Sequence, residues 1–198
     1  MEKIGKRSNG SEMKILFLNG SPRKRGNTAL TLGLLGEFLG NEPETESIHI
    51  ADLDIRPCRG CRMCFDRGEE SCPLKDDLLG IHAKILAAEC VILSSPVYVN
   101  DVSGCTKTLI DRLAFVCHRP QYWSTPFYLL ATTGGTPFKH TLRTLQTAVI
   151  SWGAPLIGSS GYVTGARSSR EEIENRHGKR IRKAADRRSE EHTSELQS

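Results

Sequence analysis

Short apolar runs alternate along the chain with longer segments in which apolar residues recur at helical spacing. Apolar runs closed by turn-forming residues predict five strands, at residues 14–20, 45–50, 90–98, 126–133 and 154–163. The helical spacing predicts five helices, at residues 28–40, 77–89, 103–115, 140–153 and 169–186. This strict alternation of strand and helix indicates an α/β fold with a parallel sheet and helices on both faces.

The first predicted strand is followed by the loop NGSPRKRGNT, residues 19–28. Ligands of parallel sheets bind beyond the carboxyl ends of the strands, so chemistry is expected here. Gly20 and Gly26 allow a tight backbone path, and the next helix directs its N-terminal amides at whatever the loop encloses. The loop matches neither GxxxxGK[ST] nor GxGxxG, which favours a single phosphate as its ligand. Its side-chain donors and cations are Ser21, Arg23, Lys24, Arg25, Asn27 and Thr28.

Two further loops are expected at the same edge of the sheet. Residues 94–104, SSPVYVNDVSG, offer apolar and aromatic side chains beside free backbone amides, which suits a flat heteroaromatic ring with polar edges. Residues 131–137, ATTGGTP, allow the backbone to approach such a ring closely at Gly134 and Gly135. Together the three loops predict a ligand that consists of one phosphate and one ring.

A cysteine-rich loop, PCRGCRMCFDRGEESCPLKDD at residues 57–77, separates the second predicted strand from the next helix. Thiolates separated by two-residue gaps, with a more distant fourth, can occupy the corners of one iron-sulfur cluster, and one 4Fe-4S cluster is the most this loop can hold. Structural zinc prefers two widely separated pairs, and reactive or merely packed thiols remain a third possibility. The candidate ligands are Cys58, Cys61, Cys64 and Cys72, and we expect Asp76 and Asp77 to cap the next helix.

The composition fits one globular domain, with 38% hydrophobic and 25% charged residues in a chain of 198. Because there is neither a stretch of about 20 apolar residues nor the apolar core of a signal peptide, we expect a cytoplasmic protein without a membrane partner. Disulfides are not expected in that compartment, and Cys90, Cys105 and Cys117 are expected to pack. The basic segment 167–187 is interpreted as a solvated helix face, so no nucleic-acid partner is predicted.

Both ends of the chain are set apart from the predicted domain at residues 13–187. Residues 1–12 are polar and precede Met13, so we expect a disordered extension there. Residues 188–198, RSEEHTSELQS, are similar to the translation of a sequencing adapter read in frame. We therefore expect a non-native tail, with the natural C-terminus missing.

The motifs GSPRKRGNT, SPVYVNDVSGCTKTLIDR and TTGG resemble the flavodoxin-like NAD(P)H-dependent FMN reductase family, and the cysteine loop resembles its iron-sulfur flavoprotein branch. The resemblance implies a three-layer sandwich around a five-stranded parallel sheet in the order 2-1-3-4-5. It implies FMN as cofactor, NAD(P)H as co-substrate, and a homodimer or tetramer. The FMN-binding residues that it implies are Ser21, Arg23, Gly26, Asn27, Thr28, Pro96, Val97, Tyr98, Val99, Asn100, Thr133, Gly134 and Gly135.

The expected function is therefore an NAD(P)H-dependent FMN oxidoreductase that passes electrons to a flavin, a quinone or another small-molecule or protein acceptor, with a 4Fe-4S cluster as a second centre if the cysteines hold one. No catalytic side chain is predicted, because hydride transfer to a flavin needs no acid or base. Amides near Gly134 and Gly135 are candidates for stabilising negative charge on the ring. The alternative is an electron carrier without a small-molecule substrate. In the segment HRPQYWSTP, we expect Tyr122 and Trp123 to fill an edge of the core, the alternative being that they cover the flavin or a neighbouring subunit.

Overall fold

The structure is a computed structural model that describes residues 13–41 and 43–195, with side chains up to residue 186. The predicted N-terminal extension lies outside these residues. So do the side chains of the predicted tail, whose backbone continues the last helix as far as Glu195.

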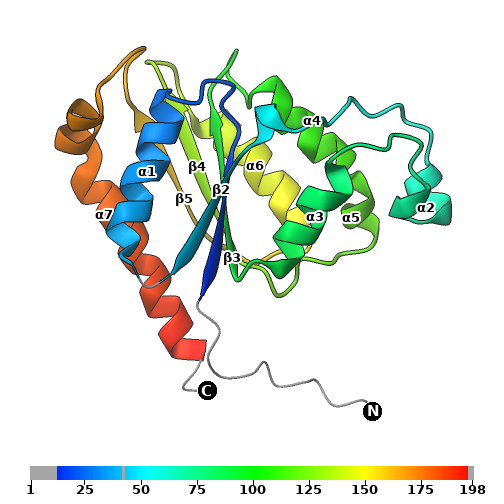
Figure 1. Cartoon of the computed structure of the whole chain (residues 1–198). Helices are drawn as coiled ribbons and strands as arrows, with labels where there is room; N and C mark the ends of the chain where they lie inside the picture. Colours follow the sequence, from blue (N-terminus) through cyan, green and yellow to red (C-terminus); the bar gives the residue numbers. More distant parts are fainter. Residues whose placement is uncertain (1–12, 42, 196–198) are drawn as a thin grey trace.

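The centre of the molecule is a five-stranded sheet in the order β2-β1-β3-β4-β5 (Figure 1). All four pairings are parallel, which confirms the predicted fold class and strand order. Asn19 of β1 pairs with Ser94 of β3, so the loops after these strands leave the same edge of the sheet. The strands span Lys14–Asn19 (β1), Glu44–His49 (β2), Cys90–Pro96 (β3), Phe127–Thr133 (β4) and Leu156–Val163 (β5).

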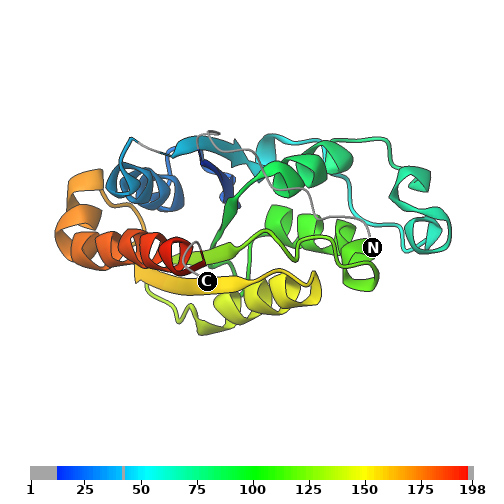
Figure 2. The ribbon, with the colours of Figure 1, turned by 90° about the horizontal axis from the view of Figure 1, so that it is seen from below.

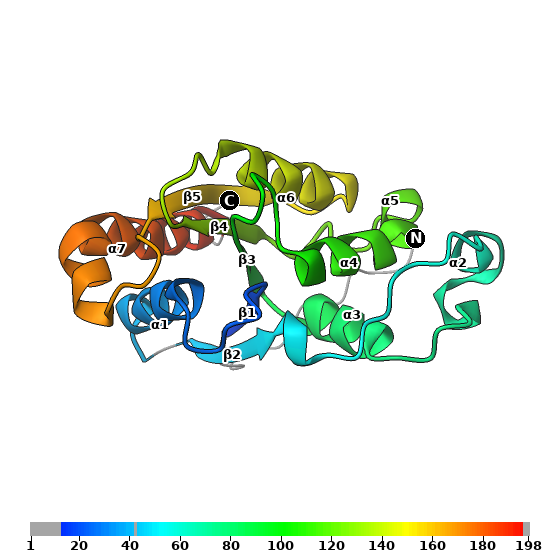
Figure 3. The same cartoon turned by 90° about the horizontal axis from the view of Figure 1, so that it is seen from above.

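Helices cover both faces of the sheet, as expected. Seen from above, α1 and α7 lie on one side, and α3, α4, α5 and α6 on the other (Figure 3). The principal helices are Asn27–Leu39 (α1), Leu78–Ala87 (α3), Gly104–Arg112 (α4), Lys139–Ser151 (α6) and Arg170–Glu195 (α7). Short elements that the sequence analysis missed are Ile50–Asp52 (η1), Met63–Arg67 (α2), Glu69–Ser71 (η2) and Ala114–His118 (α5).

Successive residues of each central strand enter opposite cores, because side chains alternate across a sheet. In β1, Leu16 and Leu18 pack with the cluster under α3 to α6, whereas Ile15 and Phe17 pack with the cluster under α1 and α7. A strand covered on both faces has no polar side, which is why these strands appear in the sequence as continuous apolar runs.

The aromatic segment after α5 divides between core and surface. Tyr122 is fully buried, where its ring lies 5.9 Å from that of Trp152. Trp123 is 70% exposed, so the prediction that both residues fill the core was right for the first and wrong for the second. Of the three cysteines expected to pack, Cys90 is buried and Cys105 is half-buried, whereas Cys117 is exposed, so the expectation was wrong for Cys117.

The basic helix α7 runs beside the edge strand β5, as the view from below also shows (Figure 2). Nε2 of His177 lies 2.9 Å from the carbonyl oxygen of Val163, and Arg180 donates to the carbonyl oxygen of Gly161 (3.1 Å). Part of the basic face therefore covers polar backbone at an exposed sheet edge rather than only facing water. Among the described residues, no helix has the length and apolarity that a membrane span requires.

Candidate functional site

A groove of about 650 Å³ opens at the carboxyl edge of the sheet, where the loops after β1, β3, β4 and β5 meet. Its size lies within the range of small-molecule sites, about 300–1,000 Å³. The lining residues are Ser21, Arg23, Asn27, Thr28, Pro96, Val97, Tyr98, Thr132, Thr133, Gly134, Thr164, Gly165, Ala166 and Arg167. The structure thus brings three predicted loops together and adds a fourth, residues 164–167, that the sequence analysis missed.

The β1–α1 loop is shaped by its own side chains. Oδ1 of Asn19 accepts the Ser21 N–H (2.9 Å), and Oγ of Ser21 in turn accepts the Arg23 N–H (3.2 Å). Gly26 has an extended backbone and no side-chain cap for α1, so the first amides of this 13-residue helix lack a side-chain acceptor. An uncapped helix N-terminus at a groove is suited to an anion.

Two of the predicted ligands are occupied in joining loops. Nδ2 of Asn27 donates to Oγ1 of Thr164 (2.9 Å) and to the carbonyl oxygen of Gly165 (2.7 Å). Oγ1 of Thr28 shares a hydrogen bond of 2.7 Å with Oγ1 of Thr132. Asn27 therefore positions the 164–167 loop, a partner 137 residues away that no local sequence signal could reveal.

The loop after β3 forms the apolar wall of the groove. The Val97 N–H donates to the carbonyl oxygen of Thr132 (2.8 Å), and Tyr98 exchanges two backbone hydrogen bonds with Asp101 (2.8 and 3.1 Å). Between these two residues, Val99 and Asn100 form the tip of a tight turn with φ of 49° and 63°. A β-branched residue with positive φ is strained. Pro96, Val97 and Tyr98 line the groove, whereas Val99 and Asn100 are not among its lining residues.

The two predicted glycines after β4 play different parts. Gly134 lines the groove, and a Cβ there would be in ordinary contact with Ala166 at 3.6 Å. Gly135 is not among the lining residues, and its N–H donates to Oγ1 of Thr133 (3.3 Å). Gly26 is not among the lining residues either, and a Cβ on it would lie 3.1 Å from the Cβ of Arg23. Of the two glycines whose amides were candidates for stabilising the ring, only Gly134 is among the lining residues of the groove.

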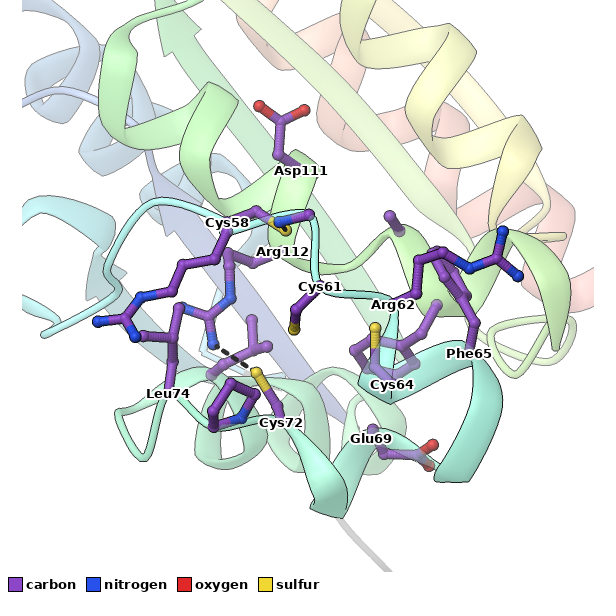
Figure 4. A pocket seen from close by; sticks show the side chains of 16 residues that line it. Cys58, Cys61, Arg62, Cys64, Phe65, Glu69, Cys72, Leu74, Asp111 and Arg112 are labelled. Carbon is purple, nitrogen blue, oxygen red and sulfur yellow. Dashed lines mark hydrogen bonds between the residues drawn. The ribbon is translucent and has the colours of Figure 1, made fainter.

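The cysteine loop encloses a second, much smaller cavity of about 70 Å³ (Figure 4). All four predicted ligands line it, together with apolar side chains that include Phe65, Leu74 and Phe115. A cavity of this size has room for a few atoms, not for an organic cofactor. Cys64 and Cys72 are half-buried, Cys58 and Cys61 are exposed, and all four are free thiols.

The arrangement of the thiols bears on which inorganic group they suit. Burial raises the pKa of Cys64, and the neighbouring thiols of Cys72, Cys58 and Cys61 raise it further. Within residues 13–41 and 43–195, no three His, Cys, Asp or Glu side chains lie close enough to hold a single metal ion. All four thiols nevertheless line one cavity, as the ligands of a single inorganic group would.

The neck of the cysteine loop is closed by hydrogen bonds independent of the thiols. The Asp54 N–H donates to Oδ2 of Asp77 (2.8 Å), and the Asp77 N–H donates to the carbonyl oxygen of Asp54 (3.0 Å). Asp77 occupies the N-cap position of α3 without a side-chain cap bond, so the prediction that both aspartates cap this helix was wrong for Asp77. Asp76 does accept the Leu78 N–H (3.3 Å), but its principal partner is Arg112.

Arg112 comes from the far end of α4 and forms a buried, bidentate ion pair with Asp76, with N–O distances of 2.6 and 3.0 Å. Burial alone would raise the pKa of the Asp76 carboxyl, but hydrogen bonds from Arg112 and from the Arg56 N–H hold it below its ordinary value. On the same helix, Lys107 and Asp111 form an ordinary surface ion pair between positions i and i+4, at 2.5 Å. The sequence alone did not show that Arg112, which directly follows Asp111, is buried.

The strand order defines a flavodoxin-like α/β protein, and its groove lies at the topological switch between β1 and β3, where ligands of such sheets bind. A family model described as NADPH-dependent FMN reductase matches residues 13–167. The chain belongs to this family, as its motifs predicted.

Related proteins support the iron-sulfur flavoprotein branch of this family. An iron-sulfur flavoprotein of Methanocaldococcus jannaschii is 43% identical over 101 residues, 50% of this chain and 51% of the relative. An iron-sulfur flavoprotein of Clostridioides difficile is 29% identical over 157 residues, 77% of this chain and 68% of the relative. The chain spans about half the length of the first of these relatives.

A solved structure supports the fold. The NAD(P)H:quinone oxidoreductase from Methanothermobacter marburgensis superimposes with a TM-score of 0.68 at 15% identity, over 88% of this chain and 98% of that one. At this identity the likeness concerns the fold alone.

Proposed function

We propose that the chain is an NAD(P)H-dependent FMN oxidoreductase. The observation that carries the proposal is the groove at the carboxyl edge, which combines an uncapped helix N-terminus with an apolar wall in a chain of the NADPH-dependent FMN reductase family. Bound FMN would supply the chemistry, by accepting a hydride from NAD(P)H and releasing two electrons to an acceptor. The protein's own part is to bind the cofactor, to orient it and to leave one face open.

The groove has a polar end and an apolar end, as FMN requires. The amides at the start of α1, including that of Thr28, would hold the phosphate together with the side chains of Ser21 and Arg23. Pro96, Val97 and Tyr98 would pack against the ring, with Thr133 and Gly134 at its polar edge. Asn27 would act by fixing the 164–167 loop over the groove. The remaining candidates, Gly26, Val99, Asn100 and Gly135, would shape the binding loops without touching the cofactor.

Arg23 provides a test of this arrangement, with Lys24 as its matched control. Arg23 lines the groove, whereas Lys24 pairs with Asp52 (2.8 Å) outside it. Losing a charge-assisted hydrogen bond costs about 1.5–3 kcal/mol, roughly a ten- to hundredfold loss of affinity. We expect Arg23→Gln to weaken FMN binding to that extent and Lys24→Gln to leave it nearly unchanged, as measured by flavin fluorescence on titration. Equal effects of the two substitutions would contradict the proposed phosphate site.

Turnover distinguishes the oxidoreductase from the alternative, an electron carrier. The FMN-loaded chain is mixed with NADH or NADPH and an excess of a quinone or free flavin, and absorbance at the nicotinamide band is followed. Sustained oxidation supports the enzyme. Reduction of bound flavin only by another protein, with no turnover of a small acceptor, supports the carrier.

We further propose that the cysteine loop holds one 4Fe-4S cluster as a second redox centre. The proposal is supported by the convergence of four free thiols on one small cavity and by the names of the relatives. Iron and sulfide are measured per chain after anaerobic purification. Cys64→Ser is expected to lose most of the iron, whereas the control Cys117→Ser, which removes an exposed thiol outside the loop, retains it. A wild-type chain with bound flavin and no iron would rule out the cluster.

Self-association is part of the proposal as well. A homodimer or tetramer is expected, and the groove between α4 and α6, whose lining includes Ile110, Ala114 and Trp152, is the candidate contact surface. Light scattering of the purified chain across a range of concentrations measures the assembly. A monomer at every concentration would contradict it.

A further inference from the structure

Arg112 is a cation buried at the wall of the cysteine cavity. Its side chain is 2% exposed, and that of Asp76 is fully buried. Figure 4 shows the guanidinium reaching toward the sulfur of Cys72, across the cavity from Cys64. Arginine is seldom buried without a partner, because a buried charge is stable only when it is paired and hydrogen-bonded.

The guanidinium joins the two arms of the cysteine loop. Nη1 donates to the carbonyl oxygen of Arg56 (2.7 Å), two residues before the first cysteine, and to Oδ2 of Asp76 (2.6 Å). Nη2 donates to Oδ1 of Asp76 (3.0 Å) and to Sγ of Cys72 (3.7 Å). One side chain from α4 therefore fixes the start of the loop, its end and one of its thiols.

Joining two arms of a loop does not by itself require a charge. A buried ion pair loses the solvation of both ions, and well-packed apolar residues often give equal or greater stability. The feature that apolar residues cannot supply is a donor directed at sulfur. Hydrogen bonds to ligand sulfurs and local net charge set the reduction potential of an iron-sulfur cluster, because a cluster gains one negative charge when it accepts an electron.

We propose that Arg112 is a positioning residue of the cysteine site that holds the loop in its ligand-binding form and raises the reduction potential of the cluster through its N–H contact with Cys72. This inference rests on the iron-sulfur site proposed above. Asp76 has the opposing role, because its carboxylate orients Arg112 while neutralising part of its charge.

Substitutions of the two partners give opposite predictions. Arg112→Gln removes the positive charge and is expected to shift the midpoint potential of the cluster to more negative values. Asp76→Asn removes the negative charge beside the guanidinium and is expected to shift it to more positive values. The control Arg67→Gln removes an exposed cation of the same loop, whose charge is screened by water, and is expected to leave the potential nearly unchanged.

The measurement is an anaerobic redox titration of the holoprotein with mediator dyes, followed through the electron paramagnetic resonance of the reduced cluster. Iron and sulfide per chain are determined for each variant, and the flavin potential serves as an internal reference. If Arg112→Gln fails to retain the cluster, Arg112→Lys keeps a charge at the site, and Asp76→Asn still reports the sign of the electrostatic effect.

A purely structural role of the ion pair predicts that both substitutions lower cluster content without opposite changes of potential. Unchanged potentials, or shifts of the same sign in Arg112→Gln and Asp76→Asn, would overturn the inference while the iron-sulfur proposal stands. A wild-type chain that takes up no iron would overturn the iron-sulfur proposal, and this inference with it, but not the proposed flavin site.

Discussion

Gly20, directly after β1, is the position where one added methyl group tests the groove most sharply. A Cβ on Gly20 would lie 2.0 Å from Oγ1 of Thr106 and 2.5 Å from the carbonyl oxygen of Ser94. The second atom belongs to the backbone of the central strand β3, so no change of rotamer relieves the contact. The Gly20 N–H also donates to this oxygen (2.9 Å), and the Gly20 carbonyl accepts Oγ of Ser103 (2.5 Å).

The magnitude follows from these contacts. Overpacking a tight site costs about 1–3 kcal/mol, and weakening one hydrogen bond adds about 1 kcal/mol. We therefore expect Gly20→Ala to lower the free energy of unfolding by about 2–4 kcal/mol. Because the β1–α1 loop must move to admit the methyl group, FMN affinity is expected to fall as well.

Gly33 provides the matched control, because the same change there has the opposite expected sign. Gly33 lies in the interior of α1, and a Cβ on it would have no neighbour within 4 Å. Replacing a helical glycine by alanine stabilises by about 0.5–1 kcal/mol. Urea denaturation gives the stability of each variant, and flavin fluorescence gives the FMN affinity. If Gly20→Ala is as stable as wild type and binds FMN equally well, the loop is not packed as described.

Three further substitutions test particular contacts. Because the pKa of Asp76 is lowered in the folded state, its carboxyl contributes stability above its unfolded pKa of about 3.9, and this contribution is lost as the pH falls through the folded value. In Asp76→Asn, the urea midpoint should therefore depend less on pH between about pH 5 and pH 2 than it does in the wild type. Val99→Gly should relieve backbone strain of about 1–3 kcal/mol, partly offset by about 0.5–1 kcal/mol of glycine entropy, so calorimetry should show an equal or higher melting temperature. Tyr122→Phe removes the buried hydrogen bond to Nδ1 of His82 (2.7 Å) and should cost about 1–3 kcal/mol in urea unfolding.

The fold could be predicted because its signals are local. A strand buried on both faces needs a short apolar run, and a covering helix needs an apolar stripe, so alternation of the two patterns indicates the parallel sheet. The predicted helix at 103–115 was too long, since it ends as α4 at Arg112 and a separate short helix follows. The short helix Met63–Arg67 in the cysteine loop has no buried residue and hence no periodic pattern to reveal it.

The candidate site could be predicted only as far as its loops carry their own signals. Glycines and hydroxyls between a first strand and the following helix favour a phosphate loop, because the helix N-terminus suits an anion. The 164–167 loop has no such pattern, and its place at the groove depends on the side chain of Asn27. The burial of Arg112 could not be predicted for a similar reason. On the sequence it continues an exposed helical surface, and only the path of the cysteine loop over α4 buries it.

Helix α4 connects the two candidate sites through the contacts at its ends. At its start, Ser103 caps the helix, donates its Oγ–H to the Gly20 carbonyl (2.5 Å) and donates its N–H to Oγ of Ser95 (2.9 Å). At its end, Arg112 holds the neck of the cysteine loop. A helix of nine residues is about 13 Å long and stiff at that length. The β1–α1 loop and the cysteine loop therefore contact opposite ends of one stiff helix. Gly20→Ala perturbs the contacts at its start, and Arg112→Gln those at its end.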